Sequence, residues 1–364
     1  MNLWNNSLYM EELNIEAARQ DIPWNLLNRK TVLITGASGM IGSYIVDLIM
    51  QRNQQYDNHI TIYALSRNRK KLEGRFGQYK NSPYFVSVEM DINNPVSLKN
   101  IEMVDYIIHA ASNTHPKEYA TDPVGTIMTN VYGTCNLFEY MRHRNKKNHC
   151  RMIILSSVEI YGENRGDINK FNEEWMGYLN CNTLRAGYPE SKRVSEALMQ
   201  AYIMQYDLDA VCVRLSRIYG ASLEDDDSKA MTQFLRNAMQ KESIILKSEG
   251  KQLYSYSYIA DAVRAILIVM LKGGRGETYN VSDDKSDVTL KEIVQYLAEL
   301  SGVEVVFQLP DKKEALGYST ATKALLDSSK VKEELGWKAY YTIYDGIKKT
   351  LNMMRQKTES IEND

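Results

Sequence analysis

The stretch TVLITGASGMIG, residues 31–42, decides the fold. Apolar and β-branched residues run directly into a loop with glycines at positions 36, 39 and 42, and the helical pattern SYIVDLIMQRN follows. Gly36 permits a tight turn, Gly39 lets the backbone approach a pyrophosphate, and Gly42 lets helix and strand pack closely. The N-terminus of the helix offers free N–H groups to phosphate. This order of strand, glycine loop and helix predicts a dinucleotide site, with a purely structural turn as the alternative.

Further short apolar runs alternate with helical patterns along the first two thirds of the chain. They are nearly continuous in apolar residues, as strands buried on both faces of a parallel sheet are. The alternation predicts a doubly wound parallel α/β sheet, in which ligands bind at the carboxyl ends of the strands. The expected strands are residues 31–35, 60–65, 84–90, 105–111, 151–157 and 209–216, and an expected helix covers 123–144.

The strict alternation fades after Tyr219-Gly220, where helical stretches mix with short strands such as EVVFQ and ETYNV. This change predicts a smaller C-terminal α/β domain that binds substrate, while residues 254–271 return to the first domain. The N-terminal residues either wrap the core or cross to a partner subunit. The expected limits are an arm over 1–29, a dinucleotide-binding domain over 30–215 and about 252–280, a substrate domain over about 216–251 and 281–350, and a polar tail over 351–364.

The composition is that of a globular protein without an unusual charge. With 364 residues and a net charge of −2, there is no global electrostatic case for nucleic acid or for an anionic membrane. The four cysteines lie far apart without a Cys-x-x-Cys, which predicts free thiols and no metal site. The N-terminus is polar and acidic, unlike a signal peptide, and no apolar run reaches membrane-spanning length. We therefore expect a cytoplasmic protein.

The end of the second expected strand bears on the choice of dinucleotide. An acidic residue there would hold the adenosine ribose of NAD, but the sequence is ALSRNRKK, with Ser66 and Arg67 at the expected place. Arg67 or Arg69 would suit the 2′-phosphate of NADP, so NADP is slightly favoured over NAD, and a solvated basic loop is the alternative. Asp91-Ile92 fits an edge contact to adenine, while an aspartate that caps the following turn is an equal alternative.

RAGYPESKRVSEAL, residues 185–198, places Tyr188 one helical turn before Lys192. Around it, in order, stand TGASGMIG, DI (91–92), HAAS (109–112), TNVYGT (129–134), SSVEIYG (156–162) and RLSRIYG (214–220). From roughly Arg29 to Tyr340 this ordered set resembles the extended short-chain dehydrogenase/reductase family. It is most similar there to the NAD(P)-dependent nucleotide-sugar epimerases, dehydratases and decarboxylases, and in particular to the UDP-glucuronate decarboxylases.

The resemblance implies a Rossmann fold and a Ser-Tyr-Lys proton relay. Tyr188 would exchange a proton with a sugar hydroxyl as hydride moves, and Ser157 would hydrogen-bond the reacting oxygen. Lys192 would hold the nicotinamide ribose and, with the oxidised nicotinamide, lower the pKa of Tyr188. Relatives that pair helices across a two-fold axis imply a homodimer through TNVYGT. The residues expected to contact the cofactor are Gly36, Ser38, Gly39, Met40, Ile41, Gly42, Ser66, Arg67, Asn68, Asp91, Ile92, Ala110, Ala111, Ser112, Asn130, Tyr188 and Lys192.

Several positions depart from the subgroups of that family. Val158 cannot transfer a proton, which disfavours the dehydratase mechanism, and Glu159 is a general base, a substrate ligand or an acceptor for backbone N–H groups. The carboxylate-binding arginine of the decarboxylases is replaced by Ala324, with Lys323 as a substitute, and their phosphate-binding arginine by Tyr254.

The residues expected to bind substrate, a nucleotide-diphosphate sugar, are Thr114, His115, Arg185, Arg217 and Tyr254. Two of them have structural alternatives. His115 is otherwise a loop residue, and Arg217 otherwise packs against Tyr219.

Three functions remain open from the sequence. The first is an epimerase, decarboxylase or related lyase that oxidises a nucleotide sugar and returns the hydride to its product. The second is an NADPH-consuming reductase of a nucleotide-linked keto sugar or ketose, which Ser66, Arg67 and Val158 favour. The third is a non-catalytic dinucleotide sensor, which the intact Ser157, Tyr188 and Lys192 disfavour.

Overall fold

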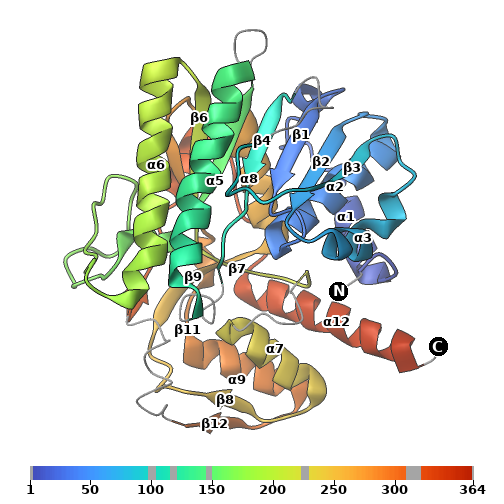
Figure 1. The fold of residues 1–364 in the computed structure, drawn as a ribbon. Coiled ribbons are helices and arrows are strands. Elements are labelled where there is room, and N and C mark those ends of the chain that lie inside the picture. The colour runs from blue at the N-terminus through green and yellow to red at the C-terminus, as the bar shows by residue number, and fades with distance from the viewer. Residues whose placement is uncertain are drawn as a thin grey trace.

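The computed structural model describes residues 3–96, 104–114, 121–144, 150–222, 229–308 and 321–362, and within these ranges seven parallel strands form the central sheet (Figure 1). In spatial order they are β10 (Thr278–Val281), β6 (Asp209–Leu215), β5 (Arg151–Ser157), β4 (Tyr106–His109), β1 (Thr31–Thr35), β2 (Thr61–Ser66) and β3 (Phe85–Glu89). The predicted doubly wound sheet is confirmed. The strand order reverses between β1 and β4, so the glycine loop after β1 lies at the switch point where such sheets bind ligands.

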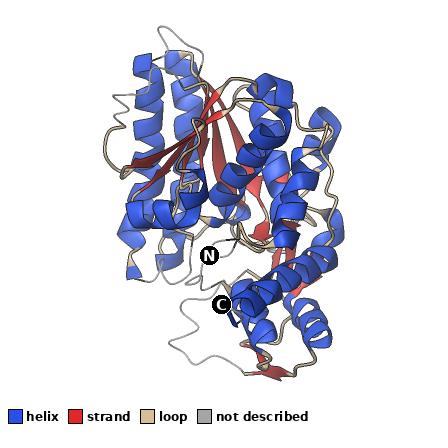
Figure 2. Ribbon diagram, turned by 90° about the vertical axis from the view of Figure 1, so that its right-hand side faces the viewer, coloured by secondary structure: helices blue, strands red, loops and turns tan. Residues whose placement is uncertain are grey.

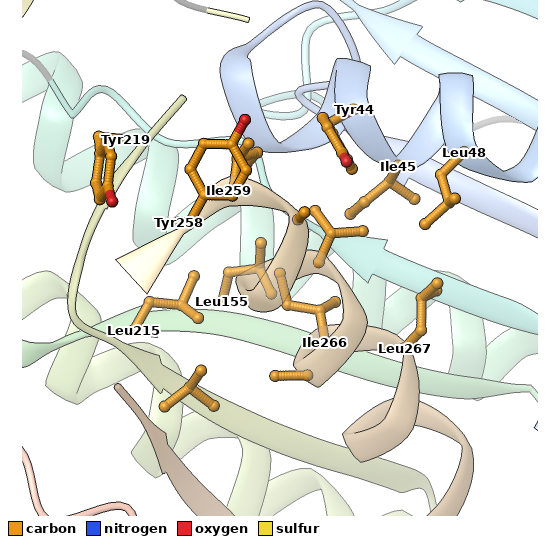
Figure 3. Close-up of a cluster of buried hydrophobic side chains, with 14 of the residues drawn as sticks. Tyr44, Ile45, Leu48, Leu155, Leu215, Tyr219, Tyr258, Ile259, Ile266 and Leu267 are labelled. Atoms are coloured by element: carbon orange, nitrogen blue, oxygen red, sulfur yellow. The ribbon is translucent and has the colours of Figure 1, made fainter. Parts of the chain in front are cut away.

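Helices cover both faces of this sheet, as Figure 2 shows from the side. On one face α5 (Pro123–Arg144) and α6 (Gly187–Tyr206) lie side by side, and Phe138 and Met141 pack on Leu33 and Ile154. On the other face, α2 (Met40–Tyr56) packs against α8 (Ile259–Lys272). Figure 3 shows Ile45 and Leu48 of α2 beside Ile266 and Leu267 of α8, with Leu155 from the sheet among them. Successive strand residues thus alternate between two apolar layers.

A smaller unit lies beyond the carboxyl end of β6 (Figure 1). Its strands β7 (Arg217–Tyr219), β9 (Leu253–Tyr258), β11 (Asp287–Thr289) and β13 (Lys323–Ala324) form one sheet, and β8 (Ile244–Leu246) pairs with β12 (Val305–Phe307). The helices α7 (Ala230–Gln240) and α9 (Leu290–Ser301) pack together beside them. Residues 254–271 therefore divide, because β9 joins the small sheet while α8 returns to the large one. The domain limits as a whole stay a prediction.

The N-terminal arm packs on its own chain. Its helix α1 (Ser7–Ala17) lies against α2 and α12 (Ile343–Glu362). The Tyr9 hydroxyl donates to Asp47 at 2.7 Å, and the Tyr258 hydroxyl donates to Glu12 at 2.8 Å. The residues expected as a polar tail from 351 onward continue α12, and its first turns there are buried against the core. The first alternative for the arm, wrapping the core, is the one that the structure shows.

Shorter elements complete the description. They are α3 (Arg69–Phe76), α11 (Ser329–Leu335) and the 3₁₀ turns η1 (Trp24–Leu27), η2 (Gly77–Tyr79), η3 (Val158–Tyr161), η4 (Leu184–Ala186) and η5 (Asp284–Ser286). Across the ranges given above, none of the helices combines the length and the apolar character that crossing a bilayer requires. The cytoplasmic location stays a prediction.

Candidate active site

The glycine loop joins β1 to α2 as the sequence predicts. Gly36 has a φ of +65°, and a Cβ there would lie 2.8 Å from the Ala111 backbone, so this position requires glycine. Gly39 caps α2 without a side-chain hydrogen bond, which leaves the N–H groups of the first helical turn open toward the cleft. A Cβ on Gly42 would run into the Gly36 carbonyl. These features fit a dinucleotide pyrophosphate at the N-terminus of α2.

The end of β2 presents hydroxyl groups to this loop. Ser66 and Ser38 share a hydrogen bond of 3.1 Å between their hydroxyl oxygens, and the described residues bring no carboxylate to this contact. Arg67 is exposed and donates weakly to the Asn113 side chain at 3.5 Å. Asn68 caps α3 and accepts from the Lys71 N–H. These contacts do not decide between the two ribose forms, so the slight preference for NADP stays a prediction.

The residues expected around the adenine and the middle of the cofactor lie along the same sheet edge. Asp91 accepts from the Asn93 N–H at 2.9 Å, which is the turn-capping alternative. Ile92 is buried beside α5, and its carbonyl accepts from Asn136. The Ala111 N–H donates to the Thr35 hydroxyl at 3.2 Å, and this contact fixes β4 against the glycine loop.

Met40, Ile41, Ala110, Ser112 and Thr114 line the cleft, while His115 lies outside the described residues. The first three of these stand beside the glycine loop. Thr114 follows β4 at the same sheet edge. Residues predicted to contact the cofactor and Thr114, which was predicted to contact the substrate, therefore line the same cleft.

Ser157, Tyr188 and Lys192 come together although they belong to different elements. Ser157 ends β5, and Tyr188 stands in the first turn of α6, buried, with a hydrogen bond to Ser157. The Lys192 ammonium donates to the Leu155 carbonyl at 2.9 Å and lies 5.9 Å from the centre of the Tyr188 ring. The predicted spacing of Tyr188 and Lys192 thus places both side chains at the carboxyl end of β5.

The electrostatics of the chain alone differ from the expectation for Tyr188. Burial raises the pKa of Tyr188 above its usual value, the Ser157 hydrogen bond lowers it, and the negative charge of Glu159 raises it further. Burial also lowers the pKa of Lys192 to about 8, against the opposing effects of Cys212 and Glu196. The predicted lowering of the Tyr188 pKa is therefore not a property of the chain by itself, because desolvation of the phenolate outweighs the Ser157 hydrogen bond.

Two supporting networks were not predicted. The Asn130 amide donates to Ser191 at 2.8 Å, the Ser191 hydroxyl donates to the Tyr188 carbonyl, and Asn130 Oδ1 is buried with no hydrogen-bond partner among the described residues. Ser191 stood within YPESK, but the motif alone does not show that it faces α5. Beneath Lys192, Glu196 binds Arg214 at 2.7 Å and accepts from Ser156. Both networks fix α6 relative to its neighbours.

A buried histidine stands beside the relay and was also missed. The Thr35 hydroxyl accepts from the Ala111 N–H and shares a second hydrogen bond with His109 Nδ1 at 2.9 Å, in which the donor depends on the tautomer of the imidazole. Burial and the charge of Lys192 lower the pKa of His109 to about 3. A neutral His109 therefore bridges β1 and β4 near Lys192. HAAS was read only for its alanines and serine.

Glu159, Arg185, Arg217 and Tyr254 form a second group in the same cleft. Arg217 reaches Glu159 at 3.2 Å, and Arg185 reaches the other carboxylate oxygen at 3.8 Å. The guanidinium of Arg217 stacks on Tyr254 at 3.5 Å from the ring centre, not on Tyr219, so that alternative is corrected. Among the described residues, the Glu159 carboxylate accepts a hydrogen bond from Arg217 and forms an ion pair with Arg185, and no backbone N–H group is seen to donate to it.

Lys323 and Ala324 do not take part in this group. Lys323 donates to Asn169 at 2.8 Å, and Ala324 is buried in β13. Neither is among the described residues that line the cleft. The proposed substitution of Lys323 for a carboxylate-binding arginine is therefore not supported by its position, because its ammonium is held by Asn169 outside the cleft.

One cleft of about 730 Å³ contains both groups. Its inner wall carries Ser157, Tyr188 and Lys192 beside the glycine loop, and its outer wall is formed by α7 and β8. Lys229, Arg236 and Lys247 line that outer wall and were missed, because nothing in AMTQFLRNAMQ or its flanks marks a ligand-binding face. Polar groups, cations and an apolar wall in one concave site suit an elongated anionic ligand.

The doubly wound sheet, the glycine loop and the buried Ser-Tyr-Lys set define a Rossmann-type dinucleotide-dependent enzyme. The profile of the NAD dependent epimerase/dehydratase family matches residues 32–282, more than half of the chain. The chain belongs to this family, and the predicted resemblance is confirmed.

Relatives and solved structures agree with that assignment. UDP-glucuronic acid decarboxylase 6 of Arabidopsis thaliana is 28% identical over 320 residues, 87% of this chain and 86% of the relative. UDP-glucuronic acid decarboxylase 1 of Danio rerio is 26% identical over 97% of this chain and 80% of the relative. A dTDP-glucose 4,6-dehydratase from Streptomyces venezuelae, solved with NAD and TYD bound, has a TM-score of 0.77 at 24% identity and covers 91% of this chain and 98% of its own. At this identity, the last likeness shows the fold alone.

Proposed function

We propose that this protein transfers hydride between a hydroxyl-bearing carbon of a nucleotide sugar and a bound nicotinamide, and that it uses Ser157, Tyr188 and Lys192 as a proton relay for the hydroxyl. The observation that carries this proposal is their convergence in one cleft with the open N-terminus of α2 and a cationic outer wall. Membership of the NAD dependent epimerase/dehydratase family supports a bound dinucleotide, and the decarboxylase relatives support a nucleotide sugar as substrate.

The chain holds its cofactor through the glycine loop and the residues beside it. Gly36, Gly39 and the first turn of α2 receive the pyrophosphate, and Lys192 holds the nicotinamide ribose. The nicotinamide, when bound, supplies hydride acceptance and return. At the α5–α6 junction beside Tyr188, Asn130 Oδ1 is buried and has no hydrogen-bond partner among the described residues, while its amide nitrogen donates to Ser191.

Tyr188 is the acid–base group in this proposal. It takes the proton of the sugar hydroxyl as hydride leaves the carbon that bears this hydroxyl. The Ser157 hydroxyl, which hydrogen-bonds Tyr188, holds the reacting oxygen. Burial keeps the Tyr188 phenol protonated in the free chain, and a positive charge beside it lowers its pKa, so that the proton-accepting phenolate becomes accessible. Lys192, whose pKa burial has lowered to about 8, supplies part of that charge below this pH.

The reaction that we favour restores the cofactor, as in an epimerase or decarboxylase. The relatives named UDP-glucuronic acid decarboxylase support a nucleotide-linked uronate as substrate. Val158 offers no proton for loss of water beside the relay, and it is buried in the cleft wall. This combination favours carbon dioxide loss or inversion over dehydration.

One observation favours a second candidate. The Ser38–Ser66 contact brings no carboxylate that would repel the 2′-phosphate of NADP, and the exposed Arg67 would suit that phosphate, which is typical of a net reductase. To separate the two, the purified protein is denatured and the released dinucleotide is identified and counted by mass spectrometry. Stoichiometric NAD, with UDP-glucuronate converted without net consumption of NAD, supports the self-restoring enzyme. An empty protein that consumes NADPH in reducing a nucleotide-linked ketone would replace it with the reductase.

We also propose a homodimer through α5 and α6. Val124, Met128 and Tyr132 recur at helical spacing on α5 and are exposed by 63%, 36% and 50%, beside the exposed Val194 of α6. Such an apolar strip on two parallel-packed helices suits pairing with a second copy. Light scattering should show a dimer that Tyr132→Glu converts to a monomer. A wild-type monomer at working concentration would contradict the proposal.

A further inference from the structure

The charged group in the cleft joins four different elements. Glu159 follows β5, Arg185 precedes α6, Arg217 stands on β7 and Tyr254 on β9. All four line the cleft that also holds Ser157 and Tyr188. The group is therefore part of the reactive cleft and not of a remote surface.

Glu159 is held between two arginines. Its oxygens lie 3.2 Å from Arg217 and 3.8 Å from Arg185, so one negative charge meets two positive charges. The Glu159 side chain is 31% exposed and that of Arg217 is 22% exposed. Ion pairs with this much access to water contribute little net free energy. An incoming anion can therefore displace the Glu159 carboxylate from Arg217 with little loss of free energy.

The guanidinium of Arg217 is only partly satisfied. One terminal nitrogen binds Glu159, whereas the other, Nη1, is buried and has no hydrogen-bond partner among the described residues. A guanidinium presents its donors as a rigid planar fork that matches two anionic oxygens at once. Because only one of its two terminal nitrogens is bonded, the Arg217 guanidinium in the wall of the cleft is suited to bind the oxygens of an anionic ligand.

Tyr254 positions this fork. Arg217 on β7 pairs with Tyr256 on β9. Tyr254 lies two residues before Tyr256 on the same strand, so the two tyrosine side chains lie on one face of the sheet. The ring of Tyr254 stacks under the guanidinium at 3.5 Å. The resemblance stated above would place an arginine at position 254. Here the positive charge comes from the neighbouring strand instead, and the residue at 254 is its support.

We infer that Arg217, stacked on Tyr254, is the anion-binding residue of the cleft, and that Glu159 occupies in the free chain the place that a substrate anion takes. On binding, anionic oxygens of the substrate replace Glu159 at Arg217, while Arg185 retains the released carboxylate. The oxygens belong either to the diphosphate or to a carboxylate on the sugar. This inference rests on the proposed function, because it requires a nucleotide sugar in this cleft.

The test is calorimetric titration of the full-length protein with UDP, UDP-glucose and UDP-glucuronate. Arg217→Gln should weaken binding about 10- to 100-fold, as loss of a charged hydrogen-bond donor does. Glu159→Gln should strengthen binding about 2- to 5-fold, because it removes the internal competitor. Arg52→Gln is the control. It removes another arginine–tyrosine stack, in which the Arg52 guanidinium lies 3.8 Å from the centre of the Tyr56 ring, and neither residue lines the cleft, so the affinity for all three ligands should stay unchanged.

Tyr254 offers a matched pair of variants. Tyr254→Phe keeps the ring that stacks on Arg217 and removes the hydroxyl, which donates to the Ala321 carbonyl at 2.6 Å, so binding should be retained. Tyr254→Leu removes the stack and should weaken binding about 2- to 30-fold. Thermal unfolding of each variant checks that the fold is intact.

The outcomes separate the two sources of the anion and the two levels of the proposal. Equal weakening of all three ligands by Arg217→Gln assigns the diphosphate, and weakening of UDP-glucuronate alone assigns the carboxylate. If the wild-type protein binds these ligands but Arg217→Gln does not weaken any of them, or Glu159→Gln weakens them, the exchange is overturned while the proposed function stands. A wild-type protein that binds none of them overturns both.

Discussion

The two ends of the cleft are built in different ways. At the buried end, which comprises the glycine loop, His109, Ser157, Tyr188 and Lys192, polar groups are fixed by short contacts to the backbone or to neighbouring strands. At the charged end, which comprises Glu159, Arg185, Arg217 and Tyr254, long side chains that are partly exposed hold one another by charge and stacking.

The difference separates two tasks. A proton relay requires groups that keep one geometry, and burial with backbone partners provides it. Ligand capture requires groups that exchange partners, and half-exposed ion pairs allow that because water screens them. We therefore expect the buried end to reject conservative substitutions and the charged end to tolerate them.

The largest effect should follow substitution of Lys192. Lys192→Met removes the charge beside Tyr188 and should lower kcat about 100- to 10,000-fold. Lys192→Arg should not restore activity, because the larger guanidinium cannot meet the single Leu155 carbonyl in a buried site. Arg217→Lys, in contrast, should keep part of the binding. Activity of Lys192→Arg near the wild-type level would remove the distinction between the two ends.

Gly36→Ala should have the next largest effect. The left-handed backbone at this position should lower the free energy of unfolding by about 1–2 kcal/mol, and crowding against the Ala111 backbone should lower it by a further ~1–3 kcal/mol. The variant should also lose dinucleotide binding. Gly302→Ala is the matched control, since its φ of +67° is similar and a Cβ there meets nothing within 4 Å. Urea unfolding and NAD titration measure both. Equal losses in the two variants would show that the close approach at Gly36 is unimportant.

The buried end should also show a pH dependence through His109. Its pKa in the folded chain is about 3, below the ordinary ~6.5, so the unfolded chain binds more protons between these values. The stability that His109 contributes is complete above pH ~6.5 and is lost as the pH falls toward 3, at about 1.4 kcal/mol per pH unit. His109→Gln should make the unfolding free energy less steep over this range. An unchanged slope would show that His109 titrates normally.

The smallest effect should come from salt and should appear at the charged end alone. Raising the ionic strength from about 0.1 M to 1 M shortens the Debye length from about 10 Å to 3 Å. Binding of UDP-glucuronate at the partly exposed Arg217 should weaken several-fold, while kcat at saturating substrate should stay constant because the relay is buried. A salt-dependent kcat with constant affinity would reverse the assignment of the two ends.

The glycine loop and the Tyr188–Lys192 pair at the buried end were predictable because local sequence determines them. The strand-loop-helix order around Gly36 and the four-residue spacing of Tyr188 and Lys192 each lie within one segment, and the parallel sheet then places their ends together. The strand at 31–35 and the helix at 123–144 match the structure at both ends.

The charged end was not predictable in the same way. Arg217 and Tyr254 meet only because β7 pairs with β9, and Glu159 meets Arg185 only because η3 lies beside the start of α6. No local pattern encodes such pairings, so sequence reasoning named the residues without their partners. The neutral His109 and the Asn130–Ser191 contact were missed for the same reason, since both depend on neighbours from other elements.

The most direct test of the central claim is turnover of UDP-glucuronate by Tyr188→Phe, compared with the wild-type protein at matched cofactor occupancy. Phenylalanine keeps the buried ring and removes only the hydroxyl that bonds Ser157. The account predicts a folded, cofactor-bound variant whose turnover has fallen at least about 100-fold at every pH, while the wild-type protein converts the substrate without net consumption of NAD. Turnover by the variant at the wild-type rate would contradict the relay.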